Sequence, residues 1–310
     1  MKKVLVSGSA GFIGSNMVKF LLDNSDYKII GVDNFSGGVN NKKFIENLEK
    51  ENPERFSFIN DNYTNVDVSG IDIVYHFAAI PSVSYSVENP IETNNSNVTN
   101  TLKFIQNCNN GGVKRFVFSS SSAVYGDVNS FPTTELYNKV PKSPYALQKS
   151  IIEEYCRLWS ELYDLDTVSL RYFNVYGPNQ YAENSYATVI CAWIKGYITN
   201  SDIRLDGDGS QSRDFTYVTD ICNANFIIGN YSGKLNGRCF NAAGGNNYSL
   251  NKIKGVIETL SKNRSKVINK PSRVGDVLKT HSDSSSLGKY GFKTKVSLEN
   301  GIKKTYNWYN

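Results

Sequence analysis

A tyrosine and a lysine four residues apart, Tyr145 and Lys149, are the residues best suited to move a proton. Ser143 and Pro144 are typical of a helix start, and apolar residues recur after them at helical spacing. The spacing predicts that both side chains lie on one face of a helix over 145–163. A free tyrosine has a pKa of about 10, and a nearby ammonium favours its phenolate. Lys149 could therefore tune a phenol that acts as a base near neutral pH.

Tyr-x-x-x-Lys also occurs in many helices that catalyse nothing, so its meaning depends on the residues around it. A serine run, Ser119 to Ser122, follows an apolar segment over 113–118 that we expect to be a strand. A hydroxyl at the end of that strand could bond the same substrate oxygen as the phenol. The serines therefore add a second group suited to the same chemistry.

A glycine-rich loop follows the first expected strand, 3–7, and precedes an expected helix over 15–22. Gly8 would make the turn, Gly11 would allow close approach, and Gly14 would let helix and strand pack tightly. Such a loop brings free backbone N–H groups and the positive helix end to one place, where a pyrophosphate could bind. Glycines at this spacing also occur at ordinary turns, so the loop alone does not establish a dinucleotide site.

Asp33, at the end of the next expected strand, 27–32, is a second sign of a dinucleotide site. A carboxylate at this point can accept hydrogen bonds from both hydroxyls of an adenosine ribose, and it would repel a 2′-phosphate. The following stretch, 34–38, contains no arginine or lysine. The loop and the aspartate together favour NAD over NADP.

Expected strands and helices alternate along the N-terminal part of the chain. This alternation predicts an α/β fold, a Rossmann-like doubly wound parallel sheet, with ligands beyond the carboxyl ends of its strands. Asp61, Asn174 and the serine run fall at or just after such ends. The remaining elements expected in this part are strands at 55–60, 71–79 and 167–173 and a helix at 91–108.

The pattern changes after Gly177 and Pro178, where polar and glycine-rich loops separate the later elements. We expect a smaller, mixed C-terminal lobe that closes over the sheet, while a strand at 238–242 returns to the sheet. The expected division is an NAD-binding domain over 1–173 and 217–243, and a substrate lobe over 174–216 and 244–310. Later helices are expected at 186–198, 218–230, 249–260 and 298–309.

Composition narrows the class of protein. The chain has 310 residues, 40% of them apolar, and a net charge of +5 from 34 basic and 29 acidic residues. The charges are spread along the chain, which argues against a nucleic-acid partner. No apolar run reaches the length of about 18 residues that a membrane helix needs, and Met1 leads into a strand without a signal peptide.

The cysteines and the first histidine read as core residues. The five cysteines are odd in number, widely spaced and set in apolar segments, and no Cys/His cluster indicates a metal. We therefore expect a reduced, cytoplasmic protein without a metal. His76 follows an apolar strand and is expected to pack in the core. The cysteines are Cys108, Cys156, Cys191, Cys222 and Cys239.

Ordered motifs along the whole chain carry a family resemblance. The chain resembles an extended short-chain dehydrogenase/reductase of the nucleotide-sugar 4-epimerase group, and is most similar to bacterial UDP-N-acetylglucosamine/UDP-glucose 4-epimerases. The motifs are Gly8-x-x-Gly11-Phe12-Ile13-Gly14, Val32-Asp33-Asn34-Phe35-Ser36, His76-Phe77-Ala78-Ala79, Ser119-Ser120-Ser121, Tyr145-x-x-x-Lys149, Arg171-Tyr172-Phe173-Asn174-Val175-Tyr176-Gly177-Pro178, Ser212-Arg213-Asp214-Phe215 and Arg273-x-Gly275-Asp276-Val277.

The resemblance implies a mechanism and a set of site residues. Tyr145 would take the proton of the sugar 4-hydroxyl while hydride leaves C4 for NAD, Ser121 would bond the same oxygen, and Lys149 would hold the nicotinamide ribose and depress the tyrosine pKa. The 4-keto sugar would then turn about its diphosphate and take the hydride back on its other face. The implied cofactor residues are Gly8, Gly11, Phe12, Ile13, Gly14, Asp33, Asn34, Phe35, Ser36, Gly38, Asp61, Asn62, Phe77, Ala78, Ala79, Asn97, Ser119, Tyr145, Lys149 and Phe173. The implied substrate residues are Ser82, Ser84, Ser121, Ser122, Asn174, Val189, Arg213, Arg273, Asp276 and Thr280.

Three positions bear on the reaction and the sugar. The dehydratases of the family carry an Asp-Glu pair where this chain has Ser122-Ala123, and neither residue can serve as the acid or base that loss of water needs. Thr280 matches the position where a tyrosine restricts the pocket to glucose and galactose, so its small side chain leaves room for an N-acetyl group. Tyr85 replaces an arginine in a loop beside the sugar, which leaves a changed ring substituent open.

Three functions remain open from the sequence. The first is a reversible UDP-sugar 4-epimerase, and the second is a relative acting on another nucleotide sugar, such as a uronic acid epimerase, a decarboxylase or a dehydratase. The third is a catalytically idle NAD-binding protein, against which the intact Ser121, Tyr145 and Lys149 argue. The resemblance also implies a homodimer, in which the helices over 91–108 and 145–163 pair into a four-helix bundle, although their apolar stripes equally suit packing on the sheet.

Overall fold

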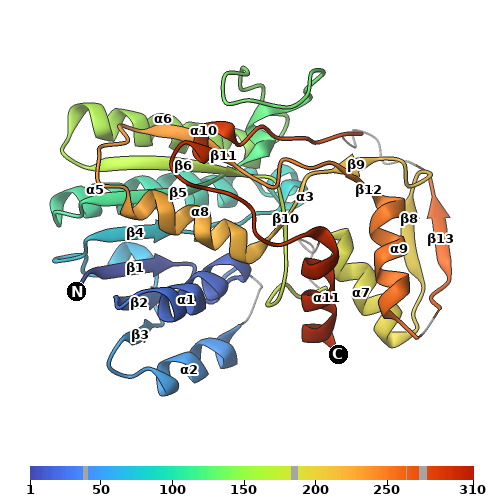
Figure 1. The fold of residues 1–310 in the computed structure, drawn as a ribbon. Helices are drawn as coiled ribbons and strands as arrows, with labels where there is room; N and C mark the ends of the chain where they lie inside the picture. The colour runs from blue at the N-terminus through green and yellow to red at the C-terminus, as the bar shows by residue number, and fades with distance from the viewer. Residues whose placement is uncertain (38–40, 183–187, 263, 272–277) are drawn as a thin grey trace.

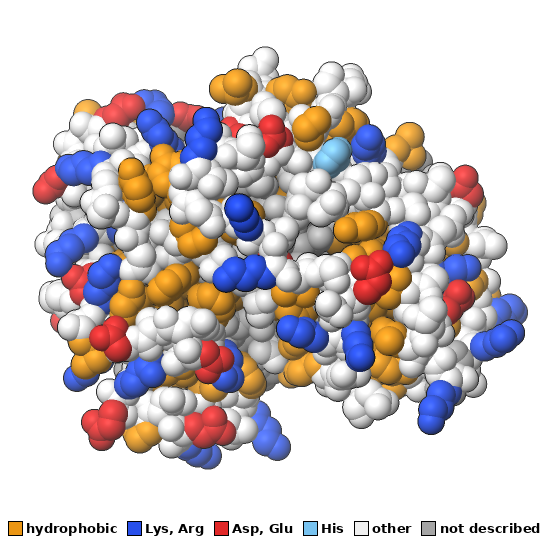
Figure 2. Space-filling view, in the orientation of Figure 1, with side chains coloured by type: hydrophobic (Ala, Val, Ile, Leu, Met, Phe, Trp, Pro, Cys, Tyr) orange, Lys and Arg blue, Asp and Glu red, His pale blue; other side chains and the backbone are white. Residues whose placement is uncertain are grey.

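The computed structural model describes residues 1–37, 41–182, 188–262, 264–271 and 278–310. A parallel sheet with helices on both faces forms the larger part, and a smaller lobe of helices and short strands lies beyond the carboxyl ends of the central strands (Figure 1). No described helix has the length and apolar character needed to cross a membrane. Figure 2 shows basic and acidic side chains scattered over one face, with no broad area of a single charge.

The described main sheet contains seven parallel strands, and the chain enters it near the middle. It first moves to one edge through β1, β2 and β3, and then crosses back to build the other half from β4 outwards. The predicted doubly wound sheet is therefore confirmed, including the return of the strand at 238–242 to its far edge. In spatial order the strands are β11 (Arg238–Ala242), β6 (Asp166–Tyr172), β5 (Arg115–Ser121), β4 (Ile73–His76), β1 (Lys3–Ser7), β2 (Lys28–Val32) and β3 (Phe56–Ile59).

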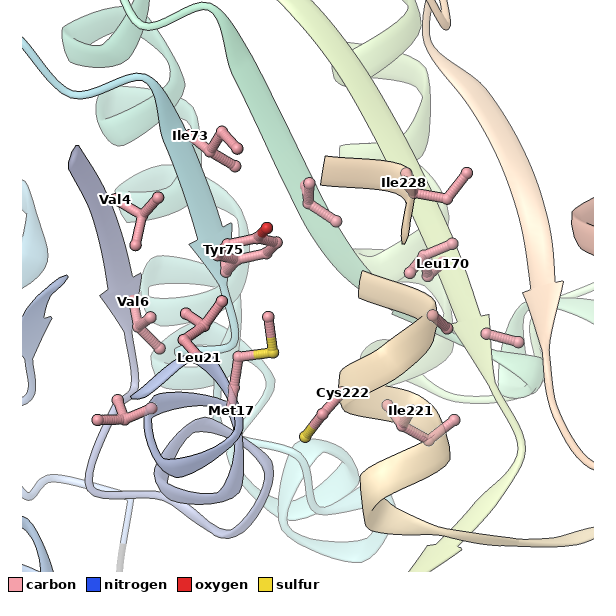
Figure 3. Close-up of a cluster of buried hydrophobic side chains, with 14 of the residues drawn as sticks. Val4, Val6, Met17, Leu21, Ile73, Tyr75, Leu170, Ile221, Cys222 and Ile228 are labelled. Carbon is pink, nitrogen blue, oxygen red and sulfur yellow. The ribbon is translucent and has the colours of Figure 1, made fainter. Parts of the chain in front are cut away.

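Apolar side chains on both sides of each strand explain why helices cover both faces. Val4 and Val6 face a core that includes Met17 and Ile221, whereas Leu5 between them faces the opposite core (Figure 3). The first core lies under α1, α2 and α8, and the second lies under α5 and α6. These helices are α1 (Phe12–Asn24), α2 (Lys42–Glu51), α5 (Asn100–Asn110), α6 (Pro144–Leu162) and α8 (Val218–Asn230).

The lobe has a core of its own. Trp193 and Tyr197 of α7, Ile253 of α9 and Ile302 of α11 are buried together. Most of its core residues fall within the ranges expected for a substrate lobe, but Tyr217 belongs to the range expected for the NAD-binding domain. The division of function between the two parts stays a prediction. The elements are β7 (Asn174–Tyr176), α7 (Val189–Thr199), β8 (Ile203–Asp206), β9 (Ser212–Arg213), β10 (Phe215–Tyr217), β12 (Tyr248–Ser249), α9 (Leu250–Leu260), β13 (Val267–Lys270), α10 (Ser285–Gly288), which packs on β11, and α11 (Leu298–Tyr309).

Two expected elements differ in detail from the structure. β5 continues through Ser121, so most of the serine run belongs to the strand and only Ser122 begins the turn η3 (Ser122–Tyr125). The single helix expected at 91–108 is divided into α4 (Pro90–Asn94), a π-helical turn η2 (Asn95–Thr99) and α5. Such π-helical turns often mark functional sites, and this one brings Asn97 against the loop after β4.

His76, the last residue of β4, packs in the core as expected. Its ring is 1% exposed, with Nδ1 2.6 Å from the Ser7 hydroxyl and Nε2 3.1 Å from the Thr101 hydroxyl. The aromatic rings of Phe104 and Phe116 lie beside it. Burial, reinforced by the positive charge of Lys149, lowers the pKa of His76 to about 3.

We predict that His76→Gln reduces the acid sensitivity of the fold. Because the folded pKa is depressed, the unfolded chain takes up a proton between about pH 6.5 and pH 3 that the folded chain does not. Wild type should lose roughly 1.4 kcal/mol of unfolding free energy per pH unit through this group in that window, and the variant should not. Urea unfolding at a series of pH values measures the slope. An unchanged slope in His76→Gln would contradict the assignment.

Candidate active site

A cavity of about 680 Å³ lies at the carboxyl ends of the central strands, as the fold predicts. It is bounded by the glycine-rich loop, the loops after β2, β3 and β4, the start of α6, and the first residues of the lobe. Most residues expected to bind the cofactor or to catalyse line it. They are Gly8, Gly11, Phe12, Ile13, Gly14, Asp33, Asn34, Ser36, Asp61, Asn62, Phe77, Ala78, Ala79, Ser119, Ser121, Tyr145, Lys149, Phe173 and Asn174.

The glycine-rich loop has the shape that a phosphate cradle needs. Gly8 has a φ of +71°, and a Cβ on it would lie 2.7 Å from the backbone nitrogen of Ala78. A Cβ on Gly14 would lie 2.0 Å from the carbonyl oxygen of Gly8, so no larger residue fits without moving the loop. The helix α1 begins at Phe12 after Gly11, and no side chain caps it. Its first N–H groups are therefore suited to phosphate oxygens, and the loop fits a dinucleotide.

Asp33 is held at the other end of this cradle by the backbone. One carboxylate oxygen accepts the N–H of Ala10 at 3.0 Å, and the other accepts the N–H of Phe35 at 2.8 Å. Burial raises the pKa of Asp33, and these backbone bonds oppose the rise. The carboxylate also lines the cavity, where it is placed to accept ribose hydroxyls. The prediction of an NAD site fits these residues.

The helix α6 positions the tyrosine and the lysine as its sequence predicts. Pro144 is its first residue, and the Ser143 hydroxyl accepts the N–H of Ala146 at 3.2 Å as an N-cap. The backbone N–H of Tyr145 donates to the Ser86 hydroxyl of α3 (Val83–Glu88) at 3.1 Å. The start of α6 is therefore held from two sides, and Tyr145 lines the cavity.

Burial is the largest influence on the pKa values of both proton-transfer groups, Tyr145 and Lys149. Lys149 is 5% exposed, and its Nζ donates to the Ser119 carbonyl at 2.7 Å while lying 5.9 Å from the centre of the Tyr145 ring. Desolvation raises the pKa of Tyr145, and a hydrogen bond with Ser121 lowers it. Burial lowers the pKa of Lys149 to about 7, with an opposing contribution from Glu153. Lys149 is not among the groups that shift the pKa of Tyr145 in this structure, so the expected lowering of the tyrosine pKa by Lys149 stays a prediction.

Asn97 supports the cavity from behind and does not line it. Its side chain accepts the backbone N–H of Ile80 at 2.8 Å and donates to the Ile80 carbonyl at 3.0 Å. The same amide donates to Gln148 of α6 at 2.9 Å. Asn97 thus ties the loop after β4, which carries Ala78 and Ala79, to the helix of Tyr145.

Other predicted residues lie outside the lining as well. Phe35 packs on Phe58, with ring centres 5.7 Å apart. The Ser82 hydroxyl accepts the N–H of Tyr85 at 3.0 Å, and lies 3.1 Å from the Ser84 hydroxyl. Ser122 and Val189 are each next in sequence to a lining residue, Ala123 and Thr188. Gly38, Arg273 and Asp276 lie outside the described residues, and all of these roles stay predictions.

Thr280 lies in a segment over 278–284 that we call the strap. Its hydroxyl accepts the N–H of Asp214 at 2.9 Å and lies 3.4 Å from the Asn174 side-chain oxygen. Its N–H donates to the Ser212 carbonyl at 3.1 Å. Asn174 lines the cavity, so Thr280 stands directly behind a lining residue. Arg213 does not line the cavity, and it lies in β9, which pairs with β12.

Buried bonds hold both sides of the strap. The Asp214 carboxylate accepts the N–H and the hydroxyl of Ser282 at 3.0 and 2.6 Å. On the other side, the N–H of Asp283 donates to the Thr133 carbonyl at 2.8 Å, and the Asn241 amide donates to both the Thr133 and the Asp283 carbonyls. The strap therefore spans from the lobe to the sheet.

Sequence reasoning missed a loop that closes one end of the cavity. Gln180 and Tyr181 line it, and this loop is fastened to α1 because Asn179 donates to the Ser15 hydroxyl at 3.2 Å. The Asn41 amide, in turn, donates to the Asn179 carbonyl at 3.1 Å. These partners are far apart in sequence, so no local pattern could have revealed them.

We predict that Gly14→Ala weakens NAD binding at least about tenfold, which corresponds to about 1.4 kcal/mol. The added Cβ would meet the Gly8 carbonyl oxygen at 2.0 Å, which forces the cradle to move. The NAD retained by purified protein, and its release on dilution, measure the effect. Gly255→Ala is the matched control, because its Cβ would meet nothing within 4 Å. Equal NAD retention by both variants would count against the cradle.

Comparison with known proteins agrees with this geometry. The family model described as "NAD dependent epimerase/dehydratase family" matches residues 4–243. The solved UDP-N-acetylglucosamine 4-epimerase of Methanobrevibacter ruminantium, in complex with UDP-N-acetylmuramic acid, is 36% identical with a TM-score of 0.90, over 99% of this chain and 98% of that chain. The solved UDP-glucuronic acid 4-epimerase of Bacillus cereus, with UDP-glucuronic acid and NAD, is 31% identical with a TM-score of 0.90, over 99% and 98%.

A third relative extends the comparison. The UDP-glucose 4-epimerase of Mycolicibacterium smegmatis is 31% identical over 316 residues, which span 99% of this chain and 98% of that protein. All three similarities run the length of the chain, and the family match covers the cradle, Asp33, Tyr145 and Lys149. The resemblance read from the motifs is thereby confirmed. The chain belongs to the NAD dependent epimerase/dehydratase family, and it is an NAD-dependent enzyme of the extended short-chain dehydrogenase/reductase type.

Proposed function

We propose that the protein is a 4-epimerase of UDP-sugars that interconverts UDP-N-acetylglucosamine with UDP-N-acetylgalactosamine and UDP-glucose with UDP-galactose. The observation that carries the proposal is the single cavity in which Ser121, Tyr145 and Lys149 meet the dinucleotide cradle and Asp33. A proton-transfer group beside a nicotinamide site suits oxidation and reduction of a carbinol carbon.

Tyr145, Ser121 and the bound NAD have separate roles in the proposed reaction. When bound, NAD supplies the chemistry of accepting a hydride from C4 of the sugar and returning it. Tyr145, as phenolate, takes the proton of the 4-hydroxyl as that hydride leaves, and gives the proton back to the same oxygen when the hydride returns. Ser121 bonds Tyr145 and can donate to the sugar oxygen as charge develops there. The proton and the hydride both return, so the net change is inversion at C4.

Lys149 acts through position and charge. Its ammonium is held by the Ser119 carbonyl at the end of β5, which leaves other protons free for the nicotinamide ribose. With the pKa of Lys149 lowered to about 7, the balance between its charged and neutral forms is close at neutral pH. In this proposal a charged Lys149, 5.9 Å from the centre of the Tyr145 ring, favours the phenolate over the neutral phenol.

The lobe supplies the nucleotide half of the substrate site in this proposal. Asn174, Arg213, Arg273 and Asp276 would bind the UDP, while Ser82, Ser84, Ser122 and Val189 would border the sugar. Anchoring the diphosphate away from the reacting ring lets the 4-keto sugar turn without leaving the enzyme. The cofactor roles of Phe35, Gly38 and Asn97 belong to the same proposal, with Asn97 acting through the loop it supports.

Three observations favour neutral hexoses and N-acetylhexosamines over other substrates. Lys149 is the sole cation among the described lining residues, and it is assigned to the nicotinamide ribose, so the described lining offers no second cation to a C6 carboxylate. Ala123 lines the cavity where a dehydratase would need a carboxylate, which disfavours loss of water. The small Thr280 behind Asn174 leaves space for an N-acetyl group.

A homodimer is part of the proposal, because apolar side chains stand exposed on the helices expected to form a bundle. Val87 of α3, Ile91 of α4 and Leu147 of α6 are 60%, 77% and 49% exposed. The packing of α3 and α4 on α6 brings these elements to one side of the sheet. A second copy would cover them with the same residues, as a two-fold interface does.

We predict that Tyr145→Phe lowers turnover by about 10² to 10⁴-fold while NAD stays bound, because the ring remains and only the proton carrier is lost. NMR of a UDP-sugar incubated with the purified variant measures turnover, and analysis of the denatured protein measures NAD. Tyr155→Phe, on the same helix and packed on Trp159, is the matched control and should keep wild-type turnover. Loss of NAD together with activity would argue against the role of the phenol.

The substrate range is tested by incubating the protein, without added cofactor, with UDP-N-acetylglucosamine and separately with UDP-glucose. We expect NMR to show conversion of both at C4. Thr280→Tyr should lower the rate for the N-acetylated sugar at least about tenfold more than for UDP-glucose, since a bulky ring would occupy the space of the N-acetyl group. Thr280→Ser is the matched control. An equal loss of rate on both sugars would show that Thr280 does not select between them. Conversion of neither sugar by the wild-type protein would overturn the proposed function.

A further inference from the structure

A buried carboxylate lies one helical turn beyond Lys149 on α6. Glu153 is 2% exposed, and Arg171 of β6 binds it with two parallel hydrogen bonds of 2.8 and 2.7 Å. The Ser120 hydroxyl donates to the same carboxylate at 2.6 Å, and the Lys139 ammonium lies 3.4 Å away. Glu153 does not line the cavity, and the mechanism above makes no use of it.

Position connects this carboxylate with both proton-transfer groups. Lys149 and Glu153 are four residues apart on one helix, so their side chains leave the same face. Ser120 directly precedes Ser121, and the Lys149 ammonium donates to the carbonyl of Ser119. The carboxylate and the ammonium therefore bind two consecutive residues, Ser120 and Ser119, directly before Ser121 at the end of β5.

We propose that Glu153 is a positioning residue, whose negative charge keeps the buried Lys149 ammonium charged and whose bond with Ser120 fixes the strand end that carries Ser121. This inference rests on the proposed function, because it assigns how the base of that reaction is kept in its working state. The wider ionic network around Glu153 then serves the active site and not the stability of the fold alone.

The charges around Lys149 agree with this role. Burial lowers the pKa of Lys149, and the one charge that raises it is the carboxylate of Glu153. Arg171 is not among the groups that shift the pKa of Lys149. Within the described residues, the titratable or charged groups around the pair are Tyr145, Glu154 and Cys156 on α6 itself, His76 on β4, Arg171 on β6, Cys239 on β11, and Tyr125, Glu135 and Lys139 in the adjoining loops.

A purely structural ion pair would behave differently. Buried ion pairs are often replaceable by neutral residues of similar shape, because their attraction only offsets the loss of hydration. Such a replacement would change stability and leave the titration of Lys149 as it was. The titration of Lys149 therefore separates the two roles.

The experiment is an NMR titration of the NAD-carrying protein labelled with ¹³C at the lysine ε-carbons, with Lys149→Arg used to assign the Lys149 signal. We expect Glu153→Gln to lower the pKa of Lys149 by about one unit or more, since a carboxylate beside a cation favours its charged form by that much. Glu153→Asp, which keeps the charge, should restore most of the shift. Glu154→Gln is the matched control, because Glu154 is adjacent in sequence, contacts the same Lys139, and is exposed.

A second variant protects the test against loss of folding. Glu153→Gln with Arg171→Gln leaves no unpaired buried charge, and we expect it to lower the pKa of Lys149 as well, because the carboxylate that favours the charged form is again removed. A Lys149 titration that is unchanged in both Glu153 variants would overturn the proposal. The same variants should move the alkaline fall of epimerase activity to lower pH. The titration needs no turnover. Absence of epimerase activity would therefore contradict the proposed function, while the Lys149 titration alone decides the role of Glu153.

Discussion

A buried ammonium bonded to a strand carbonyl is the constraint on which the arrangement of the active site depends. Lys149 crosses from α6 to Ser119, and this bond fixes how the helix lies over β5. Tyr145 lies one turn earlier on the same helix, so its distance from the end of β5 follows from the same contact. A buried charge that has lost its hydration must be stabilised by neighbouring groups. Here the Ser119 carbonyl, the ring face of Phe118 and the carboxylate of Glu153 stabilise the Lys149 ammonium.

The second requirement is the close approach of backbone to backbone around the cradle. Gly8 packs on the end of β4, and Gly14 packs on Gly8, with no space for side chains. This packing brings the start of α1, the end of β2 and the loop after β4 to one cavity edge. Asn97 and Asn179 then fasten the loops on either side of that edge to α6 and α1. The cofactor end of the site is thus built mainly from backbone, whereas the reacting end is built from side chains.

Local signals in the sequence predicted much of this arrangement. The N-cap Ser143, the helix at 218–230 and the carboxylate at Asp33 depend on neighbouring residues, and each appears where the pattern placed it. Features that depend on distant contacts were not predictable. The π-helical turn follows from the bond of Asn97 to Ile80, the closing loop follows from the bond of Asn179 to Ser15, and the pKa of Tyr145 follows from burial that a sequence does not display.

Hydrogen bonds hold the strap that carries Thr280 at both ends and in its middle. Its ends are held by buried bonds to Asp214 on one side and to Thr133 and Asn241 on the other, and in its middle the Thr280 hydroxyl accepts the N–H of Asp214 at 2.9 Å and lies 3.4 Å from Asn174. A residue without a hydroxyl at this position would leave the Asp214 N–H without this bond. In the proposed function Thr280 also borders the sugar, so sugar choice and the attachment of the lobe to the sheet would depend on the same short segment.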